Sequence, residues 1–79
     1  MDDWYPVQVK QKDRAGRPDI DAFETAMQRA ERQKGFYVSF GYTKDAEREI
    51  DRFFRRTASV IVPLTVKEIL EEQIARKLA

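Results

Sequence analysis

Residues 36–40 read Phe-Tyr-Val-Ser-Phe, a run of aromatic and β-branched side chains that ends at Gly41. Such a run is typical of a β-strand, and its apolar character on both faces favours a strand inside a sheet. A second apolar run, Ser-Val-Ile-Val, predicts another buried strand over residues 59–62. The middle of the chain is therefore predicted to contribute two strands to one sheet.

The segment before residues 36–40 has the pattern of an amphipathic helix. Its apolar residues share one stripe at helical spacing: Ile20, Phe23, Met27 and Ala30. Asp19 and Asp21 suit a cap or first turn, and Asp21 and Glu24 have the spacing of a capping box. Gly35 is suited to the left-handed conformation that often ends a helix. We therefore expect a helix from about residue 18 to residue 33.

Two more helices are expected in the second half of the chain. Thr43 is predicted to cap a helix that reaches about residue 56, with an inward face made of Ala46, Ile50, Phe53 and Phe54. Pro63 and Leu64 are expected to turn the chain. Thr65 and Glu68 then have the spacing of a capping box and predict a third helix, whose apolar positions are Ile69, Leu70, Ile74 and Leu78.

Residues 5–10, Tyr-Pro-Val-Gln-Val-Lys, predict a short first strand. Strand periodicity puts Gln8 and Lys10 on one face, with Val7 and Val9 backing the strand on the other. The order βαβαβα is typical of an α/β fold with a mainly parallel, three-stranded sheet. Three strands are few for a complete α/β domain. We therefore expect residues 1–79 to be a single domain that is part of a larger one, or to pair with another copy.

Composition excludes several function classes. The chain has 79 residues, no cysteine and no histidine, which removes the usual zinc ligands and the histidine-based nucleophilic triads. Its net charge is only +1, so any binding of nucleic acid must rest on local charge. No apolar run approaches the ~20 residues of a membrane span, and the acidic N-terminus lacks the apolar core of a signal peptide. We expect a cytoplasmic protein.

The stretch from Gln8 to Arg17 is the best candidate for chemistry. Gln8 and Lys10 project together from the first strand, and a basic loop with Lys12, Arg14 and Arg17 follows. A strand-end lysine can stabilise charge that develops on a phosphate. Loop arginines and backbone N–H groups can hold neighbouring phosphates of DNA. The alternative is a solvated edge strand followed by an exposed, charged loop.

The same residues resemble a known nuclease family. Val7-Gln8-Val9-Lys10 followed by Gly16-Arg17-Pro18-Asp19-Ile20, and then by Lys34-Gly35-Phe36-Tyr37-Val38, resembles the Mrr-type branch of the PD-(D/E)xK restriction endonucleases. The resemblance extends from about residue 5 to residue 70. It is particularly like the C-terminal segment of some bacterial DNA methyltransferase proteins of restriction–modification type. It implies a partial restriction-endonuclease-like fold and DNA as the partner.

The resemblance also implies roles for single residues. Lys10 would be the catalytic lysine, and Gln8 would offer an amide oxygen near a Mg²⁺ ion. The family also needs an aspartate on an earlier strand, and Asp2 and Asp3 lie too close to Val7 to supply it. We therefore expect no metal and no DNA cleavage from the chain by itself, with Mg²⁺ bound only in a longer parent protein. The alternative is a module without catalysis that docks DNA or protein, as a homodimer.

Three further groups have a functional and a structural interpretation. Asp19 and Asp21 are interpreted as a metal or general-base pair, or as helix caps. Four aromatic residues are interpreted as base-stacking groups or as packing groups of the sheet: Phe36, Tyr37, Phe40 and Tyr42. Trp4 and Tyr5 are interpreted as an exposed interface patch or as cover for an edge of the sheet. The second helix carries four arginines: Arg48, Arg52, Arg55 and Arg56. They are interpreted as phosphate contacts, or as a solvated face whose charge is neutralised by Glu47, Glu49 and Asp51.

Overall fold

The structure is a computed structural model that describes residues 4–10 and 13–78. Its elements in chain order are β1 (Val7–Val9), α1 (Arg17–Arg29), β2 (Lys34–Ser39), α2 (Lys44–Thr57), β3 (Val60–Thr65) and α3 (Val66–Leu78). The βαβαβα order and the α/β class confirm the prediction.

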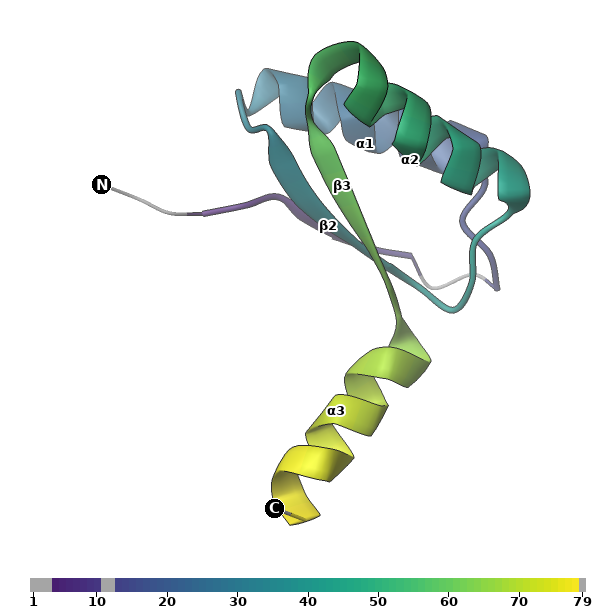
Figure 1. Cartoon of the computed structure of the whole chain (residues 1–79), viewed down its shortest axis with the longest axis vertical. Coiled ribbons are helices and arrows are strands. Elements are labelled where there is room, and N and C mark those ends of the chain that lie inside the picture. Colours follow the sequence, from purple (N-terminus) through teal and green to yellow (C-terminus); the bar gives the residue numbers. More distant parts are fainter. Residues whose placement is uncertain (1–3, 11–12, 79) are drawn as a thin grey trace.

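The three strands form one parallel sheet in the order β1-β2-β3 (Figure 1). Gln8 lies beside Tyr37 across the β1–β2 ladder, and Val9 lies beside Val38, which in turn pairs with Leu64. The all-parallel pairing confirms the predicted sheet. β1 is shorter than predicted, because only residues 7–9 have strand geometry within the expected range 5–10.

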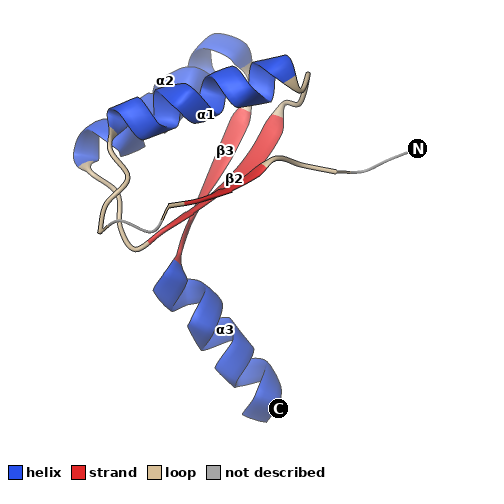
Figure 2. Cartoon of the chain, turned by 180° about the vertical axis from the view of Figure 1, so that it is seen from behind, coloured by secondary structure: helices blue, strands red, loops and turns tan. Residues whose placement is uncertain are grey.

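Helices α1 and α2 pack against each other on the same face of the sheet (Figure 2). The core lies between them and the strands, and its largest fully buried side chains are Phe53, Ile20, Met27 and Ile61. The predicted inward stripes are confirmed at these helix positions. Phe54 is the exception, because half of its surface is exposed.

The other face of the sheet is open. Val7 and Val9 are 60% and 55% exposed, and they alternate with Gln8, which points to the same side as the buried Tyr37. Gln8 and Lys10 share one face of β1, as predicted. The prediction that Val7 and Val9 pack behind the strand is wrong, because both are exposed. The helices cover the side of Gln8 and Lys10, and the valines lie on the uncovered side.

The boundary between α1 and β2 differs from the prediction. The helix ends at Arg29, because Glu31 adopts a left-handed conformation (φ 55°) and the Arg32 N–H donates to the carbonyl of Met27 at 3.0 Å. Gly35 is not the cap. It lies inside β2, where an added Cβ would be 2.8 Å from two ring carbons of Phe23. A close crossing of strand and helix therefore requires this glycine.

Pro63 and Leu64 do not form the predicted turn, because β3 continues through them to Thr65. The N–H of Val60 points toward β2 and donates to the carbonyl of Gln33 at 2.7 Å. Alternation along a parallel strand then directs the nitrogen of Pro63 away from β2, toward the outer edge. A proline at that position costs the sheet no hydrogen bond.

Tyr42 ties the ends of β2 and β3 together. Its hydroxyl lies 2.8 Å from the carbonyl oxygens of both Tyr37 and Leu64, so its proton can be donated to either strand. Burial raises the pKa of Tyr42 to about 12. The phenol therefore remains protonated and able to donate at neutral pH.

α3 leaves the end of β3 and extends away from the other two helices (Figure 1). Its predicted capping box is confirmed: Thr65 Oγ1 accepts the Glu68 N–H at 3.1 Å, and Glu68 Oε1 accepts the Thr65 N–H at 3.0 Å. Leu70 and Ile74 are 56% and 57% exposed on it. Within the described ranges, none of the helices has the length and apolar character to cross a membrane.

Candidate functional site

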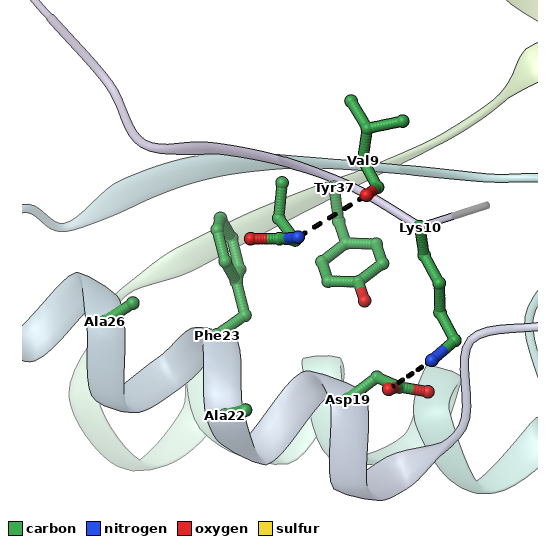
Figure 3. A pocket seen from close by; sticks show the side chains of 8 residues that line it. Val9, Lys10, Asp19, Ala22, Phe23, Ala26 and Tyr37 are labelled. Atoms are coloured by element: carbon green, nitrogen blue, oxygen red, sulfur yellow. Dashed lines mark hydrogen bonds and ion pairs between the residues drawn. The ribbon is translucent and has the colours of Figure 1, made fainter.

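The candidate site is a pocket of about 540 Å³ between the end of β1 and α1 (Figure 3). Strand alternation turns Gln8 and Lys10 toward the helix, where α1 presents Asp19, Ala22, Phe23 and Ala26. Gln8 is exposed, and its amide N–H₂ lies 3.4 Å from the carbonyl of Val9. The pocket therefore contains both residues that the sequence singled out as catalytic candidates.

Lys10 is held by an ion pair to Asp19. The Lys10 Nζ to Asp19 Oδ1 distance is 2.6 Å, and the two side chains are 17% and 28% exposed. The Lys10 N–H donates to the carbonyl of Val38 at 2.9 Å, which continues the β1–β2 ladder by one residue. Asp19 Oδ2 accepts the Gly16 N–H at 2.8 Å and closes the first turn of α1. The expected capping role of Asp19 is confirmed, and it is combined with a contact to Lys10 that was not predicted.

Tyr37 forms the floor of the pocket between the strand and the helix. It is 3% exposed, and its ring packs edge-on against Phe23 with the centroids 5.4 Å apart. Figure 3 shows its hydroxyl directed toward the pair of Lys10 and Asp19. Burial raises the pKa of the Tyr37 phenol, the charge of Asp19 adds to this increase, and Lys10 opposes it. Tyr37 therefore packs in the core, and the alternative of base stacking is not supported for it.

The basic loop after β1 is anchored to the end of β2. The Ala15 N–H donates to the carbonyl of Gly41 at 2.9 Å, and the Thr43 N–H donates to the carbonyl of Ala15 at 3.0 Å. Ala15 is fully buried, whereas the side chain of Arg14 is exposed beside this anchor. Lys12 lies outside the described residues. The DNA-binding roles of Lys12 and Arg14 stay predictions.

Arg17 lies on the opposite side of α1 from the pocket. Its guanidinium is 3.8 Å from Asp21 Oδ2 and 3.6 Å from Glu49 Oε1, at the junction with α2. A residue advances about 100° around a helix, which separates the side of Arg17 from the side of Asp19. The structure therefore brings Gln8, Lys10 and Asp19 together and places Arg17 elsewhere, so its DNA-binding role also stays a prediction.

Two glutamates are buried between α1 and α2. Glu24 is 7% exposed and lies 3.5 Å from Arg56, and Glu49 is 3% exposed and lies 3.6 Å from both Arg17 and Arg52. Glu24 Oε2 and Glu49 Oε1 are buried and have no hydrogen-bond partner among the described groups. Burial raises the pKa of Glu24 to about 8, the neighbouring Glu49 carboxylate adds to this increase, and Arg56 opposes it. Glu24 therefore holds a proton at neutral pH.

The predicted locations of both glutamates were wrong, although the predicted neutralisation of an arginine of the second helix by Glu49 is confirmed at Arg52. Glu24 was expected to form a capping box with Asp21, and Glu49 was expected on a solvated face. Each instead lies within a buried stripe, because Glu24 follows Ile20 by one helical turn and Glu49 precedes Phe53 by one turn. That spacing is the signal that could have identified them.

The described residues do not fit a Mg²⁺ ion in the pocket. Both carboxylate oxygens of Asp19 are engaged, one by an ammonium and one by a backbone N–H, and Gln8 adds only a neutral amide. Asp21, Glu24 and Glu49 are the only three carboxylates of the described part with oxygens within 4.8 Å of one another. Three arginines already pair with them, on the far side of α1. Neither place offers the uncompensated carboxylates that Mg²⁺ requires.

Comparison with known proteins identifies the family of the chain. A family model for the Mrr catalytic domain, described as "Restriction endonuclease", matches residues 2–71. No curated protein and no solved structure gives a match. The matched segment contains β1, the pocket and both buried helices. Because the match covers most of the 79 residues, the chain belongs to the Mrr-type restriction endonuclease family.

Proposed function

We propose that the chain is a DNA-binding part of a restriction-endonuclease-like protein, in which Lys10 contacts a phosphate of the DNA backbone. The observation that supports this most strongly is the placement of Lys10 and Gln8 on one face, at the rim of a pocket, in a chain of this family. An ammonium at that position suits a phosphodiester, because it donates charge-assisted hydrogen bonds to anionic oxygens.

Three residues would contact DNA in this proposal. Lys10 donates to a phosphate oxygen, Gln8 adds an amide donor or acceptor beside it, and Arg14 in the anchored loop reaches a neighbouring phosphate. Arg17 joins them only if it leaves its carboxylate partners. Such contacts fix the position of a protein on DNA and carry little sequence information.

Cleavage would require groups beyond the described pocket. We propose that Mg²⁺ is held by carboxylates of a longer parent protein, and that the chain by itself binds DNA weakly and leaves it intact. The resemblance to C-terminal segments of DNA methyltransferase proteins supports a parent of the restriction–modification type. Incubation of plasmid DNA with the chain and Mg²⁺ tests the first point, and nicking by the chain alone would contradict it.

The alternative of a protein-docking module is favoured by one observation. The open face of the sheet carries Val7 and Val9 at 60% and 55% exposure, next to the half-buried Phe36 and Val38. Apolar surface of this kind commonly marks an interface. Sedimentation of the chain distinguishes the cases: a homodimer at micromolar concentration would support a docking role, and a monomer that binds DNA would support the leading proposal.

The decisive comparison uses two lysine variants that remove the same charge. Lys10→Ala removes the pocket ammonium, whereas Lys67→Ala removes an exposed ammonium on α3 that pairs with Glu71. Binding of a fluorescent DNA duplex is measured by anisotropy at low salt. We expect Lys10→Ala to weaken binding about fivefold, because one solvent-accessible ion pair contributes up to ~1 kcal/mol, and we expect Lys67→Ala to have little effect. Equal losses in both variants would contradict a specific role for Lys10.

A further inference from the structure

We propose that Asp19 is a positioning residue that holds the Lys10 ammonium at the rim of the pocket, where it meets a DNA phosphate. This inference rests on the proposed contact between Lys10 and DNA. It assigns a second role to a carboxylate that already caps α1.

The two oxygens of Asp19 act on two different elements. Oδ1 lies 2.6 Å from Lys10 Nζ at the end of β1, and Oδ2 accepts the Gly16 N–H at 2.8 Å at the start of α1. The helix therefore fixes the carboxylate, and the carboxylate fixes the ammonium. The backbone of Lys10 is fixed as well, because its N–H donates to Val38 at 2.9 Å.

This arrangement orders a flexible side chain before any ligand arrives. A lysine side chain has many rotamers, and ordering it on binding costs conformational entropy. At 17% exposure and with its ammonium paired, Lys10 is already ordered in the folded protein. An ammonium has three N–H donors, so the pair with Asp19 leaves donors for a phosphate oxygen. Positioning by Asp19 therefore favours the phosphate contact.

A carboxylate next to a lysine can also act in the opposite way. If Asp19 only competes with phosphate, its removal frees the Lys10 charge and makes Lys10 more important for DNA binding. If Asp19 positions Lys10, its removal makes Lys10 less important. The overall repulsion between a carboxylate and DNA affects both cases equally. The sign of the coupling between the two residues separates them, and a double-mutant cycle measures that sign.

The experiment compares the effect of Lys10→Ala on DNA affinity in three backgrounds. In the wild-type background we expect a loss of about fivefold, and in the Asp19→Asn background a loss below about twofold. Asp21→Asn is the matched control, because Asp21 is an exposed carboxylate of the same helix whose partner is Arg17. In that background the loss should stay about fivefold, as in the wild type.

A nuclear magnetic resonance measurement on the full chain supplies a readout that does not depend on DNA. The two ε-methylene protons of Lys10 should have distinct chemical shifts in the wild type and in Asp21→Asn. They should merge in Asp19→Asn, because the side chain is no longer held. If Asp19→Asn does not fold, Asp19→Glu serves instead: it keeps the charge, moves the carboxylate and should reduce the effect of Lys10→Ala.

The outcomes separate this inference from the proposed function. If Lys10→Ala costs as much or more in the Asp19→Asn background, Asp19 competes with DNA and the positioning role is wrong, although the DNA contact of Lys10 stands. Unchanged ε-methylene shifts in Asp19→Asn would overturn positioning as well. If Lys10→Ala has no effect in the wild-type background, the proposed DNA contact itself is wrong and the positioning role fails with it.

Discussion

Replacement of Glu24 by glutamine should make the protein more stable at neutral pH, although it removes a buried, paired side chain. Glu24 lies between α1 and α2 with 9% of its side chain exposed, and burial raises its pKa from 4.5 to about 8. The folded protein therefore keeps the Glu24 proton at pH 7, whereas the unfolded chain releases it. Release of the proton lowers the free energy of the unfolded wild-type chain. Glutamine has no such proton to release, so the unfolded variant is not stabilised in this way.

The sign and the size of the effect follow from linkage. Because the folded pKa is the higher one, the contribution of Glu24 to stability is complete below pH 4.5 and is lost as the pH rises toward about 8. Each pH unit between these values costs ~1.4 kcal/mol, which amounts to ~3 kcal/mol at pH 7. We expect Glu24→Gln to be more stable than the wild type by about 3 kcal/mol at pH 7 and equal to it near pH 4.

The assay is urea unfolding followed by circular dichroism at several pH values from 4 to 8. Glu71→Gln is the control, because it makes the same chemical change at an exposed position that pairs with Lys67. A surface pair of this kind contributes ~0–1 kcal/mol, so the control should follow the wild type at every pH. If stability depends on pH in the same way in Glu24→Gln and the wild type, or if the variant is less stable at pH 7, Glu24 does not hold a proton in the folded protein.

Four further substitutions test the packing, each by urea unfolding at neutral pH. Gly35→Ala should cost about 2 kcal/mol, because the new Cβ would lie 2.8 Å from the ring of Phe23; a neutral or stabilising effect would contradict the close crossing. Tyr42→Phe should cost about 1 kcal/mol by removing the hydroxyl between the two strand ends, and an unchanged stability would show that water replaces it. Val9→Thr on the open face should cost less than ~1 kcal/mol and Ile61→Thr in the core more than ~2 kcal/mol, so equal costs would mean that the faces are assigned wrongly.

The order of elements could be predicted because local patterns determine it. The apolar runs at residues 36–40 and 59–62 predicted two strands. The cap residue Thr43 and the capping box of Thr65 and Glu68 predicted the starts of α2 and α3 within one residue. The errors lie where tertiary contacts override local preference. Gly35 was predicted to end the first helix, because glycine readily adopts the left-handed conformation found there. In the structure, glycine is required at this position because α1 approaches the strand closely. Pro63 was predicted to turn the chain, but its nitrogen faces the outer edge of β3, which pairs with no further strand among the described residues.

The candidate site could be predicted only in part. Strand periodicity alone put Gln8 and Lys10 on one face, and the structure places both at the same pocket. The pair of Lys10 with Asp19 joins residues on two elements separated by a loop, and no spacing rule connects them. The burial of Glu24 and Glu49 could have been predicted from their spacing of one helical turn to Ile20 and Phe53. Their ion pairs with Arg56 and Arg17 join residues on different helices, and no spacing rule connects them.

The salt dependence of DNA binding shows whether the Lys10 ammonium contacts a phosphate. The dissociation constant of the chain and a DNA duplex is measured at increasing salt for the wild type and for Lys10→Ala. Each phosphate contact contributes ~0.9 to the slope of the logarithmic plot. We expect Lys10→Ala to lower the slope by about 1 and Lys67→Ala to leave it unchanged. A slope that is identical in the wild type and in Lys10→Ala would show that the pocket lysine does not contact DNA.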